Sequence, residues 1–183
     1  MSLQLQSFCV GFGVGLVGDA CHVASGTTRY TVPWMPALGA SAVWFPLLVG
    51  AAVTGAAAVG YRLGLPRRPR DLRALSLGCA LVLALYALTS CLRAVASLPA
   101  VMLCGSLALA IWLWWDPCAR CLALAAACAV IGPAVEIGLV AVGAVEWSAE
   151  SRGLLGVAPW LPCLYFAAAT IASGLCGALE QRA

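Results

Sequence analysis

The chain has 183 residues, of which 63% are hydrophobic and only 9% are charged, and its mean hydropathy is +1.00. Soluble domains carry about 25% charged residues, so this composition excludes an ordinary water-soluble protein. All ten basic residues are arginines and the net charge is +3, which excludes the strongly basic surface that a nucleic-acid-binding protein needs.

Charged residues and prolines divide the chain into six apolar stretches. A bilayer core about 30 Å thick needs roughly 20 apolar residues per helix, and in hydrocarbon each segment must satisfy its own backbone hydrogen bonds. The sequence therefore predicts an all-α membrane protein, a single domain over residues 1–183, built as a bundle of six transmembrane helices. The expected helices cover about residues 5–24, 36–61, 74–92, 94–115, 121–145 and 157–179.

Two polar residues, Asp19 and His22, lie near the end of the first stretch. They are three positions apart, so on a helix they share a face. Two interpretations stay open. Either both side chains are solvated at the membrane interface, or they pair inside the bundle.

Arginines are distributed unevenly between the connections, and five of them lie in the second one, "YRLGLPRRPRDLR". One side of the membrane receives seven arginines and the other three: Arg62, Arg67, Arg68, Arg70, Arg73, Arg120 and Arg182 against Arg29, Arg93 and Arg152. Because positive residues concentrate on the cytosolic side, the sequence predicts that both termini are cytosolic.

The connection after the fourth helix, "WDPCARC", holds Cys118 and Cys121 in C-x-x-C spacing. This spacing is typical of thiol oxidoreductases and of half a zinc site. The predicted orientation places both thiols on the reducing, cytosolic side, and the sequence has no second C-x-x-C pair. We therefore expect no catalytic residue, metal ligand or cofactor, and keep a membrane thiol oxidoreductase as an alternative.

One carboxylate, Glu136, lies inside the fifth apolar stretch, "IGPAVEIGLVAV", three residues after Pro133. An acid at the centre of a membrane helix costs about 2.5–3.5 kcal/mol and usually marks a site. A proline also frees the carbonyl four residues earlier, which can leave a polar gap. Three hypotheses follow: a protonated acid that locks two helices, a hydrogen-bonding group for a bound lipid or sterol, and a proton-coupled transporter.

Three motifs, "SAVWFP" from Ser41, "LALAIWLWWD" from Leu107 and "PWLPCLYFAA" from Pro159, occur in the same order as in a known family. With them the chain resembles the Insig proteins over residues 39–177. The resemblance implies a six-helix bundle with cytosolic termini and no catalysis. Animal members lie in the endoplasmic reticulum, bind oxysterols and hold the polytopic partner Scap, and bacterial relatives hold a diacylglycerol-type lipid.

The resemblance also implies residue roles. Asp116 matches the cytosolic-loop aspartate that contacts the partner. Together with Glu136, the matched motif positions are the candidates for lipid or sterol binding: Trp44, Pro46, Trp160, Pro162 and Phe166.

The last helix departs from the family pattern, because "SGLCGAL" keeps Gly174 and Gly177 but lacks the asparagine and arginine found there. We therefore expect a minimal, non-enzymatic regulatory protein that holds a sterol or a diacylglycerol-like lipid. Its expected partners are that lipid and further copies of the chain, with a Scap-like partner if the source is eukaryotic and no nucleic acid. We expect it in the endoplasmic reticulum of a eukaryote or the cell membrane of a bacterium.

Overall fold

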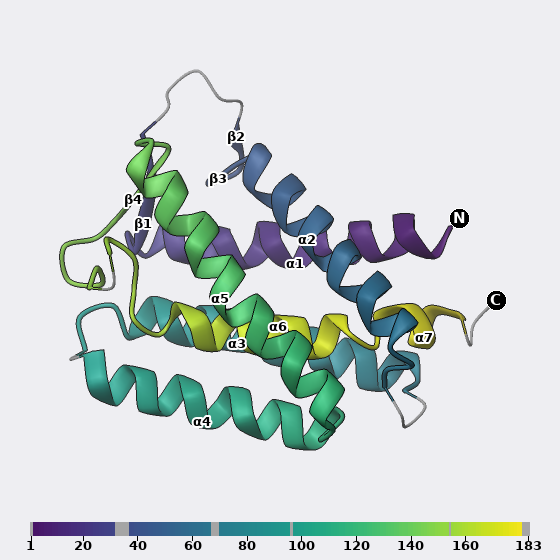
Figure 1. Ribbon diagram of the computed structural model, residues 1–183. Coiled ribbons are helices and arrows are strands. Elements are labelled where there is room, and N and C mark those ends of the chain that lie inside the picture. Colours follow the sequence, from purple (N-terminus) through teal and green to yellow (C-terminus); the bar gives the residue numbers. More distant parts are fainter. Residues whose placement is uncertain (1, 32–36, 67–69, 96, 154, 181–183) are drawn as a thin grey trace.

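The computed structural model describes residues 2–31, 37–66, 70–95, 97–153 and 155–180. Within these residues the chain forms seven helices and four short strands (Figure 1). The elements are α1 (Leu3–Ala24), β1 (Thr28–Tyr30), β2 (Ala37–Leu38), β3 (Ser41–Ala42), α2 (Trp44–Arg62), α3 (Leu72–Cys91), α4 (Ser97–Trp115), α5 (Ala119–Ala141), β4 (Val145–Trp147), α6 (Leu161–Ala172) and α7 (Leu175–Glu180).

Among the described residues, six stretches are long and apolar enough to cross a membrane. Helices α1 to α5 make the first five, and α6 with α7 makes the sixth, Leu161–Leu179. This arrangement confirms the predicted all-α, six-helix membrane fold. The side of the membrane on which the termini lie stays a prediction.

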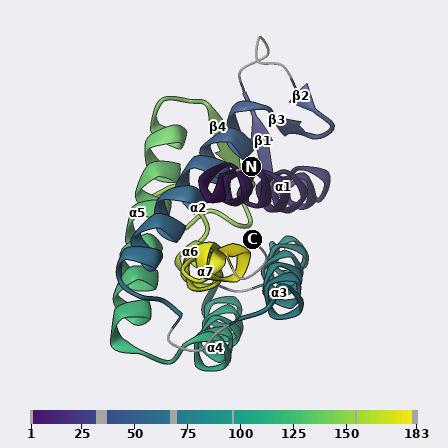
Figure 2. The ribbon, with the colours of Figure 1, turned by 90° about the vertical axis from the view of Figure 1, so that its right-hand side faces the viewer.

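The sixth span forms the centre of the bundle. In the most apolar segment of this span, 67% of the residues are buried. In the other five spans the buried share is 22–33%, so those helices face outward. Figure 2 shows α6 and α7 in yellow, surrounded by the remaining helices. Many core residues come from this span, including Leu161, Leu164 and Ile171.

Helices α1 and α2 approach each other closely because α1 carries glycines on the contact face. A Cβ atom added at Gly11 would lie 2.6 Å from Cβ of Val53, and one at Gly15 would lie 2.7 Å from Cβ of Val49. Small residues of this kind allow close helix packing where the surrounding lipid is as apolar as the side chains.

Several helices are shorter than the sequence predicts. The second was expected over 36–61, but α2 begins at Trp44, because Ala37–Leu38 pairs with Ser41–Ala42 in a hairpin. The fifth was expected to reach residue 145, but α5 ends at Ala141 before Gly143, whose φ is +70°.

The other ends also differ. The fourth helix, expected from residue 94, begins at Ser97, and the last, expected from 157, begins at Leu161 and is interrupted after Ala172. The third helix, expected over 74–92, covers Leu72–Cys91. Residues 67–69 and 181–183, which hold three of the predicted cytosolic arginines, lie outside the described residues.

The residues that follow α5 form a strand instead of a further helical turn. In this strand, β4, Val145 lies opposite Tyr30 and Trp147 opposite Thr28, so β4 pairs antiparallel with β1. The pairing joins the first and fifth connections at one end of the bundle. It thereby encloses the polar residues at the end of α1.

Candidate functional site: a cleft between α2 and α5

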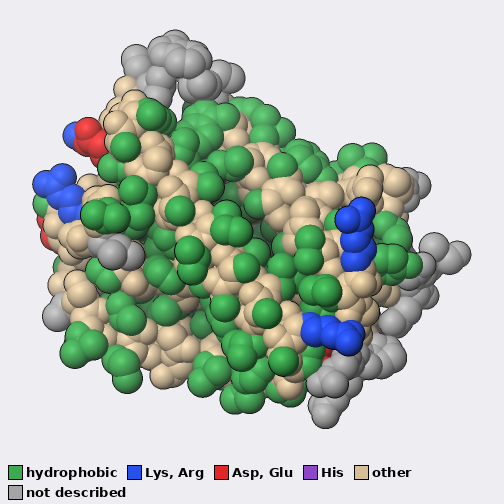
Figure 3. Space-filling view, viewed as in Figure 1, with side chains coloured by type: hydrophobic (Ala, Val, Ile, Leu, Met, Phe, Trp, Pro, Cys, Tyr) green, Lys and Arg blue, Asp and Glu red, His purple; other side chains and the backbone are tan. Residues whose placement is uncertain are grey.

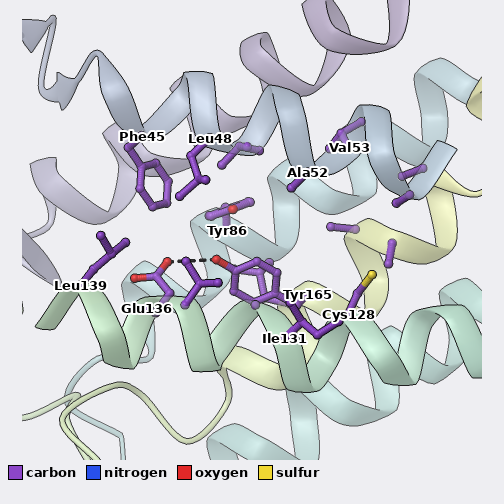
Figure 4. Close-up of a pocket in the computed structure, with 18 residues that line it drawn as sticks. Phe45, Leu48, Ala52, Val53, Tyr86, Cys128, Ile131, Glu136, Leu139 and Tyr165 are labelled. Atoms are coloured by element: carbon purple, nitrogen blue, oxygen red, sulfur yellow. Dashed lines mark hydrogen bonds between the residues drawn. The ribbon is translucent and has the colours of Figure 1, made fainter. Parts of the chain in front are cut away.

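A cleft of about 150 Å³ lies between α2 and α5, with α6 as its floor. In Figure 4 Phe45, Leu48 and Ala52 of α2 face Ile131 and Leu139 of α5 across it. Most of the lining is aliphatic or aromatic, and none of the lining residues is basic. Figure 3 shows hydrophobic side chains over most of this face, with charged ones near its two ends.

The cleft opens sideways, toward the medium that surrounds the bundle. Its edges are formed by Leu48, Ile131 and Val135, whose side chains are 40%, 60% and 42% exposed. In a membrane these exposed edges face the lipid chains. A ligand can therefore enter laterally and extend beyond the enclosed volume.

The polar end of the cleft is formed by Glu136 of α5. This carboxyl group is only 5% exposed, and Oη of Tyr165 on α6 donates a hydrogen bond of 3.0 Å to its Oε1 (Figure 4). Gly132 allows this contact, because an added Cβ would lie 2.2 Å from Cδ1 of Tyr165. The structure thus places a hydrogen-bonded carboxyl group, that of Glu136, beside a cleft that is mostly apolar.

Glu136, Tyr86 and Tyr165 also line a smaller polar chamber of about 10 Å³, which continues from the cleft toward β1 and β4. Oη of Tyr30 donates a 2.6 Å hydrogen bond to Oδ2 of Asp19 in the chamber wall. Burial raises the pKa of Tyr30, and the negative charge of Asp19 raises it further. Tyr30 therefore stays a hydroxyl donor.

Two residues that line this chamber carry unpaired polar atoms. Oγ1 of Thr28 and Nε1 of Trp147 are buried and have no hydrogen-bond partner among the described residues. A polar cavity of this size holds about one water molecule. The chamber can therefore hold a single hydroxyl-sized group.

Asp19 and His22 are both buried, at 4% exposure each. They have different partners, since Asp19 accepts from Tyr30 and Nε2 of His22 lies 2.9 Å from Oγ1 of Thr89. Burial excludes the solvated interpretation. The paired interpretation is right about the location and wrong about the partners, because β1 brings a tyrosine to Asp19 and α3 brings Thr89 to His22.

Of the six predicted lipid-binding residues, only Glu136 lines the cleft. Trp44 packs beside Tyr30, with ring centroids 5.5 Å apart, at the start of α2. Pro46 is buried in the first turn of that helix.

The three candidates near the start of the last span also lie outside the cleft. Trp160 is 2% exposed and packs 5.5 Å from the His22 ring. Pro162 and Phe166 are half-buried in α6. Four of these five motif residues thus lie at the starts of α2 and α6, and Phe166 lies within α6.

The partner-contact candidate, Asp116, is 2% exposed in the turn between α4 and α5. Sγ of Cys118 donates to its Oδ2 at 3.5 Å, and the same sulfur accepts from the backbone N–H of Cys121 at 3.4 Å as the N-cap of α5. A partner would reach the Asp116 carboxylate only if this turn opened.

Cys118 and Cys121 are buried, at 5% and 0% exposure, and all ten cysteines of the chain are free. Among the described residues, no group of three or more His, Cys, Asp or Glu side chains is arranged to hold a metal ion.

Sequence reasoning missed Tyr165, Tyr86 and Gly132 as parts of the site. Tyrosine is the one useful signal, because its hydroxyl needs a partner when it is buried. Both tyrosines lie inside predicted spans, where a buried hydroxyl has few partners along its own helix. The contact between Gly132 and Tyr165 joins two helices and leaves no trace in either local sequence.

Comparison with known proteins gives concordant results. A curated relative from Mycolicibacterium vanbaalenii, an INSIG protein homolog, is 39% identical over 168 residues, which are 91% of this chain and 81% of the relative. The crystal structure of the mycobacterial Insig homologue MvINS from Mycobacterium vanbaalenii matches with a TM-score of 0.91 and 37% identity, over 100% of this chain and 97% of that one.

A second crystal structure, of a cross-linked MvINS trimer, matches with a TM-score of 0.89 and 37% identity, over 99% of this chain and 95% of that one. No family model matches the chain.

Proposed function

The chain belongs to the Insig family, and we propose that it is a non-enzymatic regulatory membrane protein that binds a neutral lipid in the cleft between α2 and α5. The observation that carries this proposal is the hydrogen-bonded carboxyl group of Glu136 beside an apolar cleft that is open to the lipid. Ligand sites are typically apolar with a few placed polar groups, and this cleft has that composition.

The lining supports a ligand with a hydroxyl or ester headgroup, such as a sterol or a diacylglycerol. Glu136 and the Tyr86 and Tyr165 hydroxyls can exchange hydrogen bonds with such a group. A phosphate headgroup has no positively charged partner in the cleft, because no arginine lines it. Burying an unpaired charge is much more costly than burying a hydroxyl that finds a partner.

The buried thiols disfavour the oxidoreductase alternative. Thiol exchange requires a thiolate that its substrate can reach, and both Cys118 and Cys121 are enclosed. The transporter alternative predicts flux of protons or solutes through the purified protein in liposomes. A lipid-binding protein shows no such flux.

We extend two further properties from the relatives to this chain. The first is a place in the cell membrane, because the relatives are mycobacterial. The second is a homo-oligomer, because MvINS was crystallised as a cross-linked trimer. Mass photometry of the protein in nanodiscs measures the oligomeric state directly.

Native mass spectrometry of the detergent-purified protein tests lipid binding. We expect a co-purifying neutral lipid of defined mass. Ala168→Phe fills the floor of the cleft and should abolish this adduct. Ala123→Phe adds the same ring on the exposed face of α5, outside the cleft, and should keep it. The proposal fails if the wild-type protein carries no neutral lipid, or if both variants bind equally.

A further inference from the structure

The polar end of the cleft between α2 and α5 carries hydrogen-bonding capacity that the protein itself does not use. Oε1 of Glu136 accepts from Tyr165 at 3.0 Å, while its other oxygen, Oε2, has no hydrogen-bond partner among the described residues. The side-chain hydroxyl of Tyr86, on α3, also has none among them. One carboxyl oxygen and one hydroxyl group are therefore left for a ligand.

Glu136 and Tyr86 are placed where one small group can reach both. They line the cleft, and they also line the polar chamber of about 10 Å³ that continues from it. Figure 4 shows the Tyr86 oxygen in the space between α2 and the hydrogen-bonded pair of Glu136 and Tyr165. A cavity of the chamber's volume holds about one water molecule, so it admits a hydroxyl group but not an acyl group.

The other polar side chains of the chamber wall are already bonded or are enclosed by protein. Asp19 accepts from Tyr30 at 2.6 Å, and Nε2 of His22 is hydrogen-bonded to α3 at 2.9 Å. The unpaired atoms of Thr28 and Trp147 are buried. The free carboxyl oxygen and the free phenol hydroxyl are thus the groups that a ligand meets as it enters from the cleft.

A free hydroxyl group is the ligand chemistry that fits this pair. A carboxylate only accepts hydrogen bonds, a carboxylic acid also donates one, and a phenol both donates and accepts. A ligand hydroxyl can therefore donate to Glu136 and accept from Tyr86, or the reverse when the acid is protonated. An ester oxygen only accepts, so it leaves one acceptor of the site unpaired, and an unpaired buried group is costly.

We propose that the site selects lipids with a free hydroxyl group, which lies between Glu136 and Tyr86 at the entrance of the chamber, against the same lipids with that hydroxyl acylated or absent. This inference rests on the proposed function, since it concerns the lipid held in the cleft. Tyr86 determines specificity through its hydroxyl, and the chamber does so through its size. A site built to bond a hydroxyl rejects the analogue that lacks it, because its own polar groups are then left unpaired.

Three lipids with the same two oleoyl chains test this selection by titration and native mass spectrometry: dioleoylglycerol, its acetate ester, and the dioleoyl ester of propylene glycol. The acetate caps the hydroxyl group, and the propylene glycol ester lacks it. We expect dioleoylglycerol to bind about tenfold more tightly than either, the effect of losing a buried hydrogen bond. Equal affinity for all three would overturn this inference and leave the proposed function standing. Failure of all three to bind would overturn both.

Tyr86→Phe removes the hydroxyl and keeps the ring. It should weaken the binding of dioleoylglycerol about fivefold and leave that of the propylene glycol ester unchanged. Tyr61→Phe makes the same change at an exposed tyrosine of α2 outside both cavities, and should affect neither lipid. Equal losses for the two lipids in Tyr86→Phe would contradict the inference, because a role in packing alone affects both lipids alike.

Discussion

Glu136 is a carboxyl group with a defined partner in a mostly apolar environment. Its hydrogen bond from Tyr165 measures 3.0 Å, and Gly132 leaves space for the tyrosine ring beside α5. Removing the acceptor of a buried hydroxyl costs more than the net gain of making the bond, because the remaining group stays desolvated. A substitution that keeps a hydrogen-bond acceptor at position 136 should therefore behave differently from one that removes it.

Glu136→Gln should keep lipid affinity and folding nearly unchanged, because the amide oxygen still accepts from Tyr165. Glu136→Leu should weaken lipid binding by about 1–3 kcal/mol, the cost of an unsatisfied polar group. Titration of the three proteins with a sterol and with diacylglycerol measures this. Equal affinity in all three would remove Glu136 from the site, and a Leu variant that is only more stable would show that the acid has a purely structural role.

Gly132→Ala should weaken lipid binding by displacing Tyr165. The added Cβ would lie 2.2 Å from Cδ1 of that ring, and overpacking of this kind costs about 1–3 kcal/mol. Gly138→Ala is the matched control on the same helix, because nothing lies within 4 Å of its added Cβ. Lipid affinity and the thermal midpoint in detergent measure both effects. Equal results for the two alanines would contradict the role assigned to Gly132.

The candidate site could be predicted only at the residue whose chemistry is unusual for its position. A lone acid in an apolar run is informative, so Glu136 could be found. Tyr165 and Gly132 are ordinary in membrane helices, and they form part of the site because α5 packs against α6. Motif matching selected Trp160 and Pro162, which the structure places at the start of α6 and outside the cleft.

At the scale of elements, Cys118 serves as a helix cap. Its sulfur accepts from the N–H of Cys121 at the start of α5. Serine is a strong N-cap residue, so its oxygen can replace this sulfur. The thiol chemistry is not required for the cap.

We therefore expect Cys118→Ser combined with Cys121→Ser to change the free energy of unfolding by less than about 1 kcal/mol, within the usual range for replacing one cap by another. Lipid affinity should stay the same. Thermal unfolding and lipid titration provide the measurements. A thiol-exchange activity of the wild-type protein that disappears in the double variant would instead support the oxidoreductase.

Hydropathy could predict how many membrane spans there are, but not where their helices end. The segment 37–42 is apolar enough to extend a helix, yet it forms a hairpin around Gly39, whose φ is +64°. Val145 belongs to an apolar run, but it pairs with Tyr30, more than 100 positions earlier. Short apolar runs do not distinguish a strand from a helix end, and a pairing between distant connections leaves no local signal.

At the scale of the whole molecule, described arginines lie at both ends of the bundle, and each end has arginines bound to backbone carbonyls as well as exposed ones. Arg29 pairs with Glu146 at 2.5 Å, and Arg93 donates to the carbonyl of Ser25. At the opposite end Arg62 and Arg73 are exposed. The sequence of the connection between α2 and α3 has two more arginines, at positions 67 and 68.

The chain contains no lysine, which allows a direct test of the predicted orientation. Arg62→Lys and Arg152→Lys each keep the positive charge and each introduce one side-chain amine at an exposed position, at opposite ends of the bundle. Because positive residues are retained on the cytosolic side, a membrane-impermeant amine reagent added outside intact cells should label Lys at position 152 and not at position 62. Peptide mass spectrometry separates these adducts from that of the N-terminal amine. Permeabilised cells, in which both amines should react, control for reactivity. Labelling of the Arg62→Lys protein alone in intact cells would reverse the topology.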